Sequence, residues 1–179
     1  GAELEFRKSI LNISKTNAST IVDFGLSVSY LYSHQPLEDV DFDDISFANT
    51  NPESALEGAS PWLVNSDITL TREGGRGNKL TATVLFNFNT DRIYSLGAPG
   101  DGKGVGNFDI DEKSILKMDF ISSYVLNNHF TIGLSVKNIL NPHFKQTKEV
   151  TPTPGTTAFE TISDYQKGIT TSIGVAYKL

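Results

Sequence analysis

Apolar and polar residues alternate along seven separate segments of the chain, and the last segment shows the pattern most clearly. From Ile169 to Leu179 one set of alternate positions reads Ile, Thr, Ile, Val, Tyr, Leu, and the other reads Thr, Ser, Gly, Ala, Lys. A period of two is that of a β-strand with one apolar and one polar face. Because the polar set is mostly small and uncharged, the pattern is typical of a strand that faces lipid on one side and an aqueous lumen on the other.

The seven segments predict seven long strands joined alternately by short turns and long loops. The expected strands are residues 3–13, 21–32, 62–72, 79–94, 115–126, 129–140 and 169–179, and the expected long loops are 34–60, 95–112 and 141–166. Such alternation gathers all short turns at one end of a sheet, as in outer-membrane barrels. We therefore predict an all-β fold in a single domain, 1–179: an antiparallel up-and-down meander of seven or eight long strands, part of a transmembrane β-barrel.

The alternation also assigns side chains to the two faces of the predicted sheet. The residues expected to face lipid are Val22, Phe24, Leu26, Val28, Val84, Phe86, Phe120, Ile132, Leu134, Val175 and Tyr177. The residues expected to face the lumen are Asp23, Asn65, Asp67, Asn87, Asn89, Asp91, Lys117, Asp119 and Lys137. Five aromatic residues fall near strand ends, as the interfacial girdles of a barrel would: Tyr30, Tyr32, Trp62, Tyr94 and Tyr124.

Charge and composition narrow the function classes. The net charge is −6 and the sequence pI is about 5.0, without a clustered basic stripe, which argues against a nucleic-acid partner. The chain has no cysteine, so a disulfide framework, a thiolate metal site and a thiol nucleophile are excluded. No apolar run approaches the roughly 18 residues of a membrane-spanning helix, a criterion that does not apply to strands.

Candidate sites for chemistry are weak throughout the sequence. Asp39, Asp41 and Asp43 alternate in an acidic loop and are the only metal candidates, but the spacing is not that of an EF-hand. The three histidines have no ligand-like spacing, and the glycine run 100–106 lacks the Lys-Ser or Lys-Thr of a phosphate-binding loop. No Gly-x-Ser-x-Gly elbow is present. We therefore expect neither an enzyme nor a cofactor.

Several motifs resemble one membrane-protein family. They are 3-ELEFRK-8, 56-LEGASPWLVN-65, 91-DRIYSLG-97, 134-LSVKNILNP-142 and 165-YQKG-168. Together they resemble the C-terminal barrel portion of a TonB-dependent outer-membrane receptor. The resemblance implies the final third of a plugged barrel of about 22 strands in the bacterial outer membrane, without its plug domain.

That resemblance also implies a function and a set of partners. The family imports scarce nutrients, such as a metal chelate or a glycan, by energy coupling. This chain would form part of the wall and would not transport alone. Its expected partners are outer-membrane lipid and either the remainder of the barrel with its plug or a second copy of the chain. Seven strands cannot close a conventional barrel, which has an even number, so we expect a curved, open meander that a partner completes.

One alternative from the residues alone is a soluble β-barrel or sandwich that binds a ligand in an apolar interior. The two interpretations differ in the surroundings of Phe24, Val28, Phe86, Phe120 and Ile132, which would be buried in the soluble protein and exposed in the membrane protein. An enzyme is a weaker third alternative, since it would need convergent titratable groups in a concave site.

Overall fold

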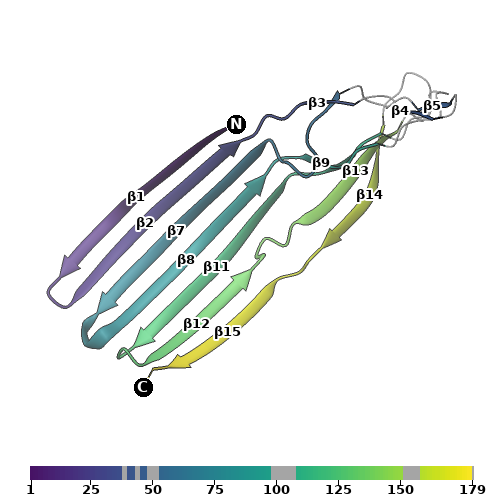
Figure 1. Cartoon of the computed structure of the whole chain (residues 1–179). Coiled ribbons are helices and arrows are strands. Elements are labelled where there is room, and N and C mark those ends of the chain that lie inside the picture. The colour runs from purple at the N-terminus through teal and green to yellow at the C-terminus, as the bar shows by residue number, and fades with distance from the viewer. Residues whose placement is uncertain (38–39, 43–44, 48–52, 98–107, 151–157, 179) are drawn as a thin grey trace.

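The chain folds into one long antiparallel sheet in a computed structural model, which describes residues 1–37, 40–42, 45–47, 53–97, 108–150 and 158–178. Seven strands lie side by side in sequence order, which confirms the up-and-down meander (Figure 1). They are β1 (Ala2–Lys15), β2 (Ala18–Tyr30), β7 (Trp62–Gly74), β8 (Asn78–Asn89), β11 (Ile115–Leu126), β12 (Phe130–Lys137) and β15 (Thr170–Tyr177). We call this sheet the wall.

The short turns of the wall lie together at one end, and the long connections lie at the other (Figure 1). A single 3-10 turn, η1 (Gly75–Gly77), joins β7 to β8. Asn127 and Asn128 have φ angles of 51° and 61°, so they form the two-residue hairpin turn with positive φ at both positions that matches strand twist. The side chain of Asn78 accepts a hydrogen bond from the Asn127 N–H at 2.9 Å and connects this turn to the neighbouring one.

Strand β1 contains an irregularity that changes the expected faces. Its register with β2 shifts between Ser9, opposite Asp23, and Leu11, opposite Val22. Ile10 is the extra residue of this β-bulge and has no partner in the register, so strict alternation no longer gives the face of Leu4 and Phe6 beyond it. Leu11 and Ile13 continue that face instead, because one inserted residue reverses the parity of a strand.

A second, four-stranded sheet extends the wall beyond its loop end. It consists of β9 (Arg92–Ser95), β10 (Ile110–Glu112), β13 (His143–Val150) and β14 (Ala158–Gln166), in the spatial order β14-β13-β10-β9. In the chain, β9 follows β8, β10 precedes β11, β13 follows β12 and β14 precedes β15. The second sheet therefore has the same lateral order as the wall strands that it continues. The expected strand 79–94 is therefore interrupted at Thr90 and Asp91, and the expected loop 141–166 contains the β13–β14 hairpin.

Short strand pairs occupy the first long connection. They are β3 (Gln35–Pro36) with β6 (Glu53–Ser54), and β4 (Val40–Phe42) with β5 (Ile45–Phe47). Within the described ranges, the structure contains no helical segment with the length and hydrophobicity of a membrane span.

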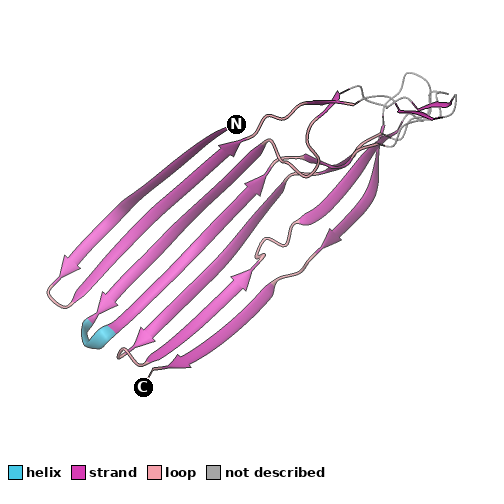
Figure 2. Cartoon of the chain, in the orientation of Figure 1, coloured by secondary structure: helices cyan, strands magenta, loops and turns pink. Residues whose placement is uncertain are grey.

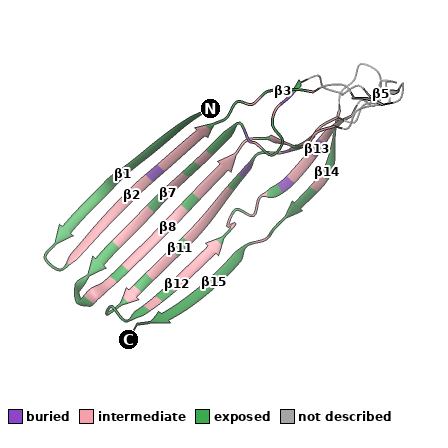
Figure 3. Ribbon diagram, in the orientation of Figure 1, coloured by how far each residue is buried: buried purple, intermediate pink, exposed green. Residues whose placement is uncertain are grey.

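The wall is a single layer that leaves both of its faces open (Figures 2 and 3). Among the described apolar residues only Ile115 and Phe144 are buried, and both lie near the junction of the two sheets. The accessible surface is 12086 Å², whereas a compact monomer of this mass exposes about 8,600 Å². None of the five residues that distinguish the two alternatives is buried, and Ile132 is 47% exposed. The described chain therefore holds no closed, dry core between layers.

The two edges of the wall are β1 and β15, which pair with β2 and β12 on their inner sides only. Every described residue of both strands is exposed. Because the wall has an odd number of antiparallel strands, the chain direction reverses an even number of times from β1 to β15. The two edge strands therefore run in the same direction (Figure 1).

Candidate functional site

The strand register places the two predicted sets of side chains on opposite faces of the wall. Residues that pair directly across an antiparallel ladder point to the same face. By this rule all eleven residues expected to face lipid share one face, the apolar face. Eight of the nine residues expected to face a lumen share the other, the polar face. The ninth, Asp91, lies just beyond the end of β8. That these faces meet lipid and a lumen stays a prediction.

Aromatic residues mark two levels on the apolar face. At the loop end the Tyr30 and Trp62 rings lie 4.7 Å apart, and at the turn end the Phe130 and Tyr177 rings also lie 4.7 Å apart. Tyr124 lies just inside the level at the turn end. It pairs with Leu80, and Leu80 pairs on its other side with Arg72, which is ten positions after Trp62. Ten residues span about 33 Å along a strand, or about 23 Å across a membrane at a 45° tilt. Tyr32 and Tyr94 lie outside the wall strands.

The middle of the polar face carries a charged pair that reaches across a strand. Arg7 Nη1 on β1 lies 3.8 Å from Asp67 Oδ1 on β7, and Arg7 Nε donates a hydrogen bond to Glu5 at 2.9 Å. Gly25, on the intervening strand β2, lies between Arg7 and Asp67 in the register. A Cβ at position 25 would collide with the Asp67 carboxylate, so glycine is required for this approach.

Polar groups continue across this face into a hollow of about 420 Å³, the middle hollow. Asn87 donates a side-chain hydrogen bond to Asn65 on the neighbouring strand. The other polar residues that line it include Lys117 and Asp119, so it is bordered by both signs of charge. The remaining predicted residues lie farther out: Asp23 accepts a hydrogen bond from Ser9, and Lys137 is exposed opposite Thr170.

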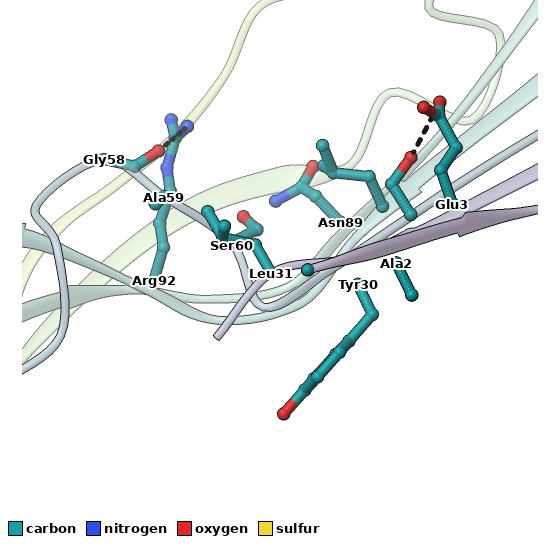
Figure 4. A pocket seen from close by; sticks show the side chains of 12 residues that line it. Ala2, Glu3, Tyr30, Leu31, Gly58, Ala59, Ser60, Asn89 and Arg92 are labelled. Carbon is teal, nitrogen blue, oxygen red and sulfur yellow. Dashed lines mark hydrogen bonds between the residues drawn. The ribbon is translucent and has the colours of Figure 1, made fainter. Parts of the chain in front are cut away.

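A larger hollow of about 570 Å³, the rim hollow, lies where the polar face meets the segment before β7 (Figure 4). The predicted residue Asn89 lines it together with Glu3, Ser60 and Arg92. The Ser29 hydroxyl donates to the Glu3 carboxylate at 3.3 Å. In Figure 4 the Tyr30 ring points to the opposite side of the sheet from Glu3 and Asn89, which agrees with the register.

Backbone and side-chain bonds hold the segment that borders the rim hollow against β9. The Gly58 N–H donates to Ile93 O at 2.8 Å, and Glu57 accepts a hydrogen bond from the Leu96 N–H at 2.6 Å. Arg92 donates from Nη1 to Gly58 O at 3.2 Å and from Nη2 to Glu112 at 3.0 Å. Gly58 has a φ of +75°, a conformation that favours glycine. The motifs 56–65 and 91–97 thus meet at one place.

The motif 134–142 forms the break between the wall and the second sheet. Asn138 and Asn141 have φ angles of 59° and 43°, the left-handed region that asparagine tolerates best after glycine. Asn138 Nδ2 donates to Gly168 O at 2.7 Å, and the Gly168 N–H donates to Asn141 Oδ1 at 2.9 Å. Asp119 accepts a hydrogen bond from the Asn138 N–H at 2.7 Å. The two asparagines therefore connect the end of β12 to the start of β15 and to β11.

Asp91 lies at the neighbouring break, between β8 and β9, and bonds to the residues between β10 and β11. Its carboxylate accepts hydrogen bonds from Lys113 Nζ at 3.0 Å and from the Ser114 N–H at 2.6 Å. Partial burial by itself would raise the pKa of Asp91, but the bonds from Lys113 and Ser114 outweigh it and the pKa is lowered. Burial raises the pKa of nearby Asp111, against the attraction of Lys113. The role of Asp91 is thus to connect strands beyond the wall.

The other candidate groups do not converge on a site. Asp39, Asp43 and the glycine run 100–106 lie outside the described residues, and Asp41 lies on β4. In the part of the chain that the structure describes, no group of three or more His, Cys, Asp or Glu side chains could hold a metal ion. His143 lies 2.6 Å from Asp164, and His129 lies against Tyr177, so these two histidines have local partners.

Sequence reasoning did not single out four residues on which this geometry depends: Gly25, Ser60, Arg92 and Asn138. Gly25 carried a usable signal, since it is a glycine within the polar set of an otherwise regular strand. The other three are recognisable only once distant segments are brought together. Comparisons with protein-family models, with curated proteins and with solved structures found no match.

Proposed function

We propose that this chain is a wall segment of an outer-membrane, TonB-dependent nutrient importer and does not transport alone. The observation that carries the proposal is the single-layer wall with two chemically different open faces. An apolar face in a soluble protein would be covered by another layer, because exposed apolar patches of this extent favour association. Lipid provides such a cover without a second layer.

Three further features support a transmembrane position. The aromatic levels are separated by about 23 Å at a 45° tilt, close to the apolar band of about 25 Å in outer-membrane barrels. The short turns and long connections lie at opposite ends of the wall. Polar-face side chains make up most of the lining of the middle hollow and contribute Glu3, Ser29, Leu63 and Asn89 to the rim hollow, so both hollows involve the face proposed to meet water.

The open edges support a partner that supplies more wall. Unpaired backbone groups are costly in hydrocarbon, so both edges need a neighbour. Because β1 and β15 run in the same direction, two copies arranged around one membrane axis would pair these edges in parallel. An antiparallel closure instead requires an odd number of additional strands. This favours the remainder of a larger barrel over a second copy as the partner, together with outer-membrane lipid.

Alternating accessibility in lipid tests the proposal. The chain has no cysteine, so single cysteines at adjacent positions, Thr83→Cys and Val84→Cys on β8, can each carry a nitroxide label. After reconstitution into vesicles, the label at position 84 should collide with oxygen, which partitions into lipid, and the label at 83 with a water-soluble nickel chelate. Ser27→Cys and Val28→Cys on β2 provide a second pair.

The opposite result is equally clear. If the chain is monodisperse in plain buffer and the labels at positions 28 and 84 collide with neither reagent, the apolar face is buried against protein. The wall proposal would then be wrong, and the soluble binding module would take its place.

A further inference from the structure

The turn end of the wall gathers basic side chains into one row, which we call the basic band. This end consists of residues 14–19, 72–79, 125–130 and 176–178, all of which the structure describes. Its charged side chains are five basic ones and one acidic one: Lys15, Arg72, Arg76, Lys79 and Lys178, with Glu73. The turn end therefore has a net charge of +4, whereas the whole chain has a net charge of −6. No basic run in the sequence indicates the band, because its charges come from two separate turns and the end of β15.

Four of the five cations are available to an external partner. Lys79 Nζ lies 2.9 Å from Glu73, so these two charges offset each other. The side chains of the other four make no ion pair and no hydrogen bond with any described residue, and all four residues are exposed. The band therefore presents unpaired positive charge to whatever lies beyond the turns.

The backbone places three of these cations at the very end of the wall. Lys15 is the last residue of β1 and pairs with Ala18 across the turn. Arg76 lies within η1, and Lys178 directly follows the last residue of β15. The Lys178 N–H donates to His129 O at 2.8 Å, which fixes its backbone against the neighbouring turn. Long basic side chains at such positions can reach head groups while their apolar stems stay beside the apolar surface.

The shape of the basic band favours a surface over a small anion. The band extends from Lys15 on β1 to Lys178 after β15, along the end of the sheet where the turns lie (Figure 1). These two strands are six strand spacings apart, or about 29 Å along the sheet. A free phosphate could contact only one or two cations of such a row at a time. A plane of anionic groups could contact all of them.

Aromatic rings next to the band favour a lipid surface over a soluble polyanion. Phe130 and Tyr177 lie at the turn end of the apolar face, and Lys178 follows Tyr177 in the chain. Aromatic rings at the ends of membrane-spanning strands lie at the level of the lipid head groups, within reach of basic side chains. A nucleic acid could meet the charges but could not cover the apolar face that begins at these rings.

We infer that the basic band binds the phosphate head groups of anionic phospholipids. This inference rests on the proposed function, because the head groups lie against the turns only if the wall spans a bilayer. Lys15, Arg76 and Lys178 are the main contacts, and Arg72 lies farther in, on β7. Since the remainder of the chain is acidic, the preference for anionic lipid belongs to the turn end alone.

Quenching of a single tryptophan by brominated lipids, measured on the full chain in vesicles, tests this inference. Trp62 is the only tryptophan and reports on the loop end. In a Trp62→Tyr background, Tyr177→Trp moves the reporter beside Lys178, and Ala18→Trp moves it opposite Lys15. The vesicles contain phosphatidylcholine and phosphatidylglycerol, and either one or the other carries bromine on its acyl chains.

The two ends of the wall should differ in the lipid that they select. At low salt, brominated phosphatidylglycerol should associate with both turn-end reporters roughly fivefold more strongly than brominated phosphatidylcholine, because each nearby cation attracts an anionic head group. Trp62 should show no preference for phosphatidylglycerol. At about 1 M salt, where charges are screened within about 3 Å, the preference at the turn end should disappear.

A matched pair of substitutions separates the band from the total charge. Lys178→Gln should lower the preference at the Tyr177→Trp reporter roughly fivefold. Lys137→Gln also removes one exposed lysine, but at the other end of the wall, and should leave the preference unchanged. Equal losses in the two variants would assign the effect to total charge and overturn the inference.

Failure of the inference is distinguishable from failure of the proposed function. If both brominated lipids quench the turn-end reporters equally, the band does not select anionic lipid and the wall proposal stands. If neither lipid quenches any reporter, the chain does not lie in lipid, and both proposals are wrong. If inorganic phosphate or a single-stranded oligonucleotide, at the phosphate concentration of the lipid, removes the preference, the band binds soluble anions and the inference is wrong.

Discussion

At the residue scale, the contacts between strands depend on a few positions with a specific side chain. Gly25 lets Arg7 reach Asp67 across an intervening strand, and Asp91 binds both Lys113 and the Ser114 N–H. Both roles depend on the pairing of strands, because the residues that come together lie far apart in the sequence. Two substitutions at this scale therefore have directions that can be stated in advance.

Replacing Gly25 should act differently from replacing another glycine of the same face. Gly25→Ala should displace the Asp67 carboxylate and lower the urea midpoint, because the new Cβ takes its position. Gly174→Ala meets no atom within 4 Å and has no positive φ, so it should stabilise the fold by about 0.4–1 kcal/mol through a less flexible unfolded chain. Equal effects of the two substitutions on the midpoint in urea would contradict the packing described around Gly25.

Asp91 should make stability depend on pH in the acidic range. Its pKa is lowered in the folded state, so its contribution is fully present above the unfolded value of about 3.9 and is lost as the pH falls through the folded value. Asp111, whose pKa is raised by burial, acts in the opposite direction, since its penalty disappears on acidification. The denaturation midpoints of the wild type and Asp91→Asn should differ most between pH 5 and 7 and converge below about pH 4. A constant difference would exclude ionised Asp91 as the cause.

At the scale of elements, four wall strands are interrupted at nearly the same level and resume in the second sheet. The interruption between β12 and β13 combines two left-handed asparagines with bonds to Gly168 and Asp119. Alternation alone continues through this motif, and the sequence therefore predicted a strand to residue 140. The backbone conformation of Asn138 ends the strand at Lys137 instead.

Two substitutions at position 138 separate backbone strain from the side-chain bond. Asn138→Gly keeps the φ of 59° accessible but loses the bond to Gly168 O, and should cost about 1 kcal/mol. Asn138→Ala loses the same bond and adds left-handed strain of roughly 1–2 kcal/mol, so it should be the less stable variant in urea denaturation. If alanine were as stable as asparagine, the break would not depend on this residue.

At the scale of the whole molecule, the level of a charge on the apolar face should decide its cost in lipid. Lys8 pairs with Phe24 between the two aromatic levels, whereas Arg72 pairs with Leu80 at the level of Tyr124. Lys8→Leu should stabilise the chain in vesicles by about 2–4 kcal/mol, and the matched control Arg72→Leu by about 0–1 kcal/mol. Denaturation from vesicles compares the two. Equal gains would place both side chains outside hydrocarbon, or both against protein.

Much of the wall was predictable because a strand's alternation is a local property. The boundaries of β11 were predicted to the residue, and the other wall strands were placed within three residues at most ends. The errors fall where a local signal is ambiguous: the bulge at Ile10, which reverses parity, and residues 141–166, where short polar strands resemble a loop. The rim hollow was not predicted, since Ser60 and Arg92 come together only after the segment 57–60 has paired with β9.

Which side chains share a face of a regular strand follows from the sequence alone, because successive residues point to opposite sides whatever surrounds them. Three strand pairs, β1–β2, β7–β8 and β11–β12, also follow from the sequence, because short turns force neighbours in the chain to be neighbours in the sheet. Contacts between distant segments exist only in the folded chain: the approach of Arg7 to Asp67 over Gly25, the two asparagines bonded to Gly168, and the bonds that hold the segment 57–60 against β9. These depend on register across strands, which pairing between remote parts of the chain establishes and no local pattern contains.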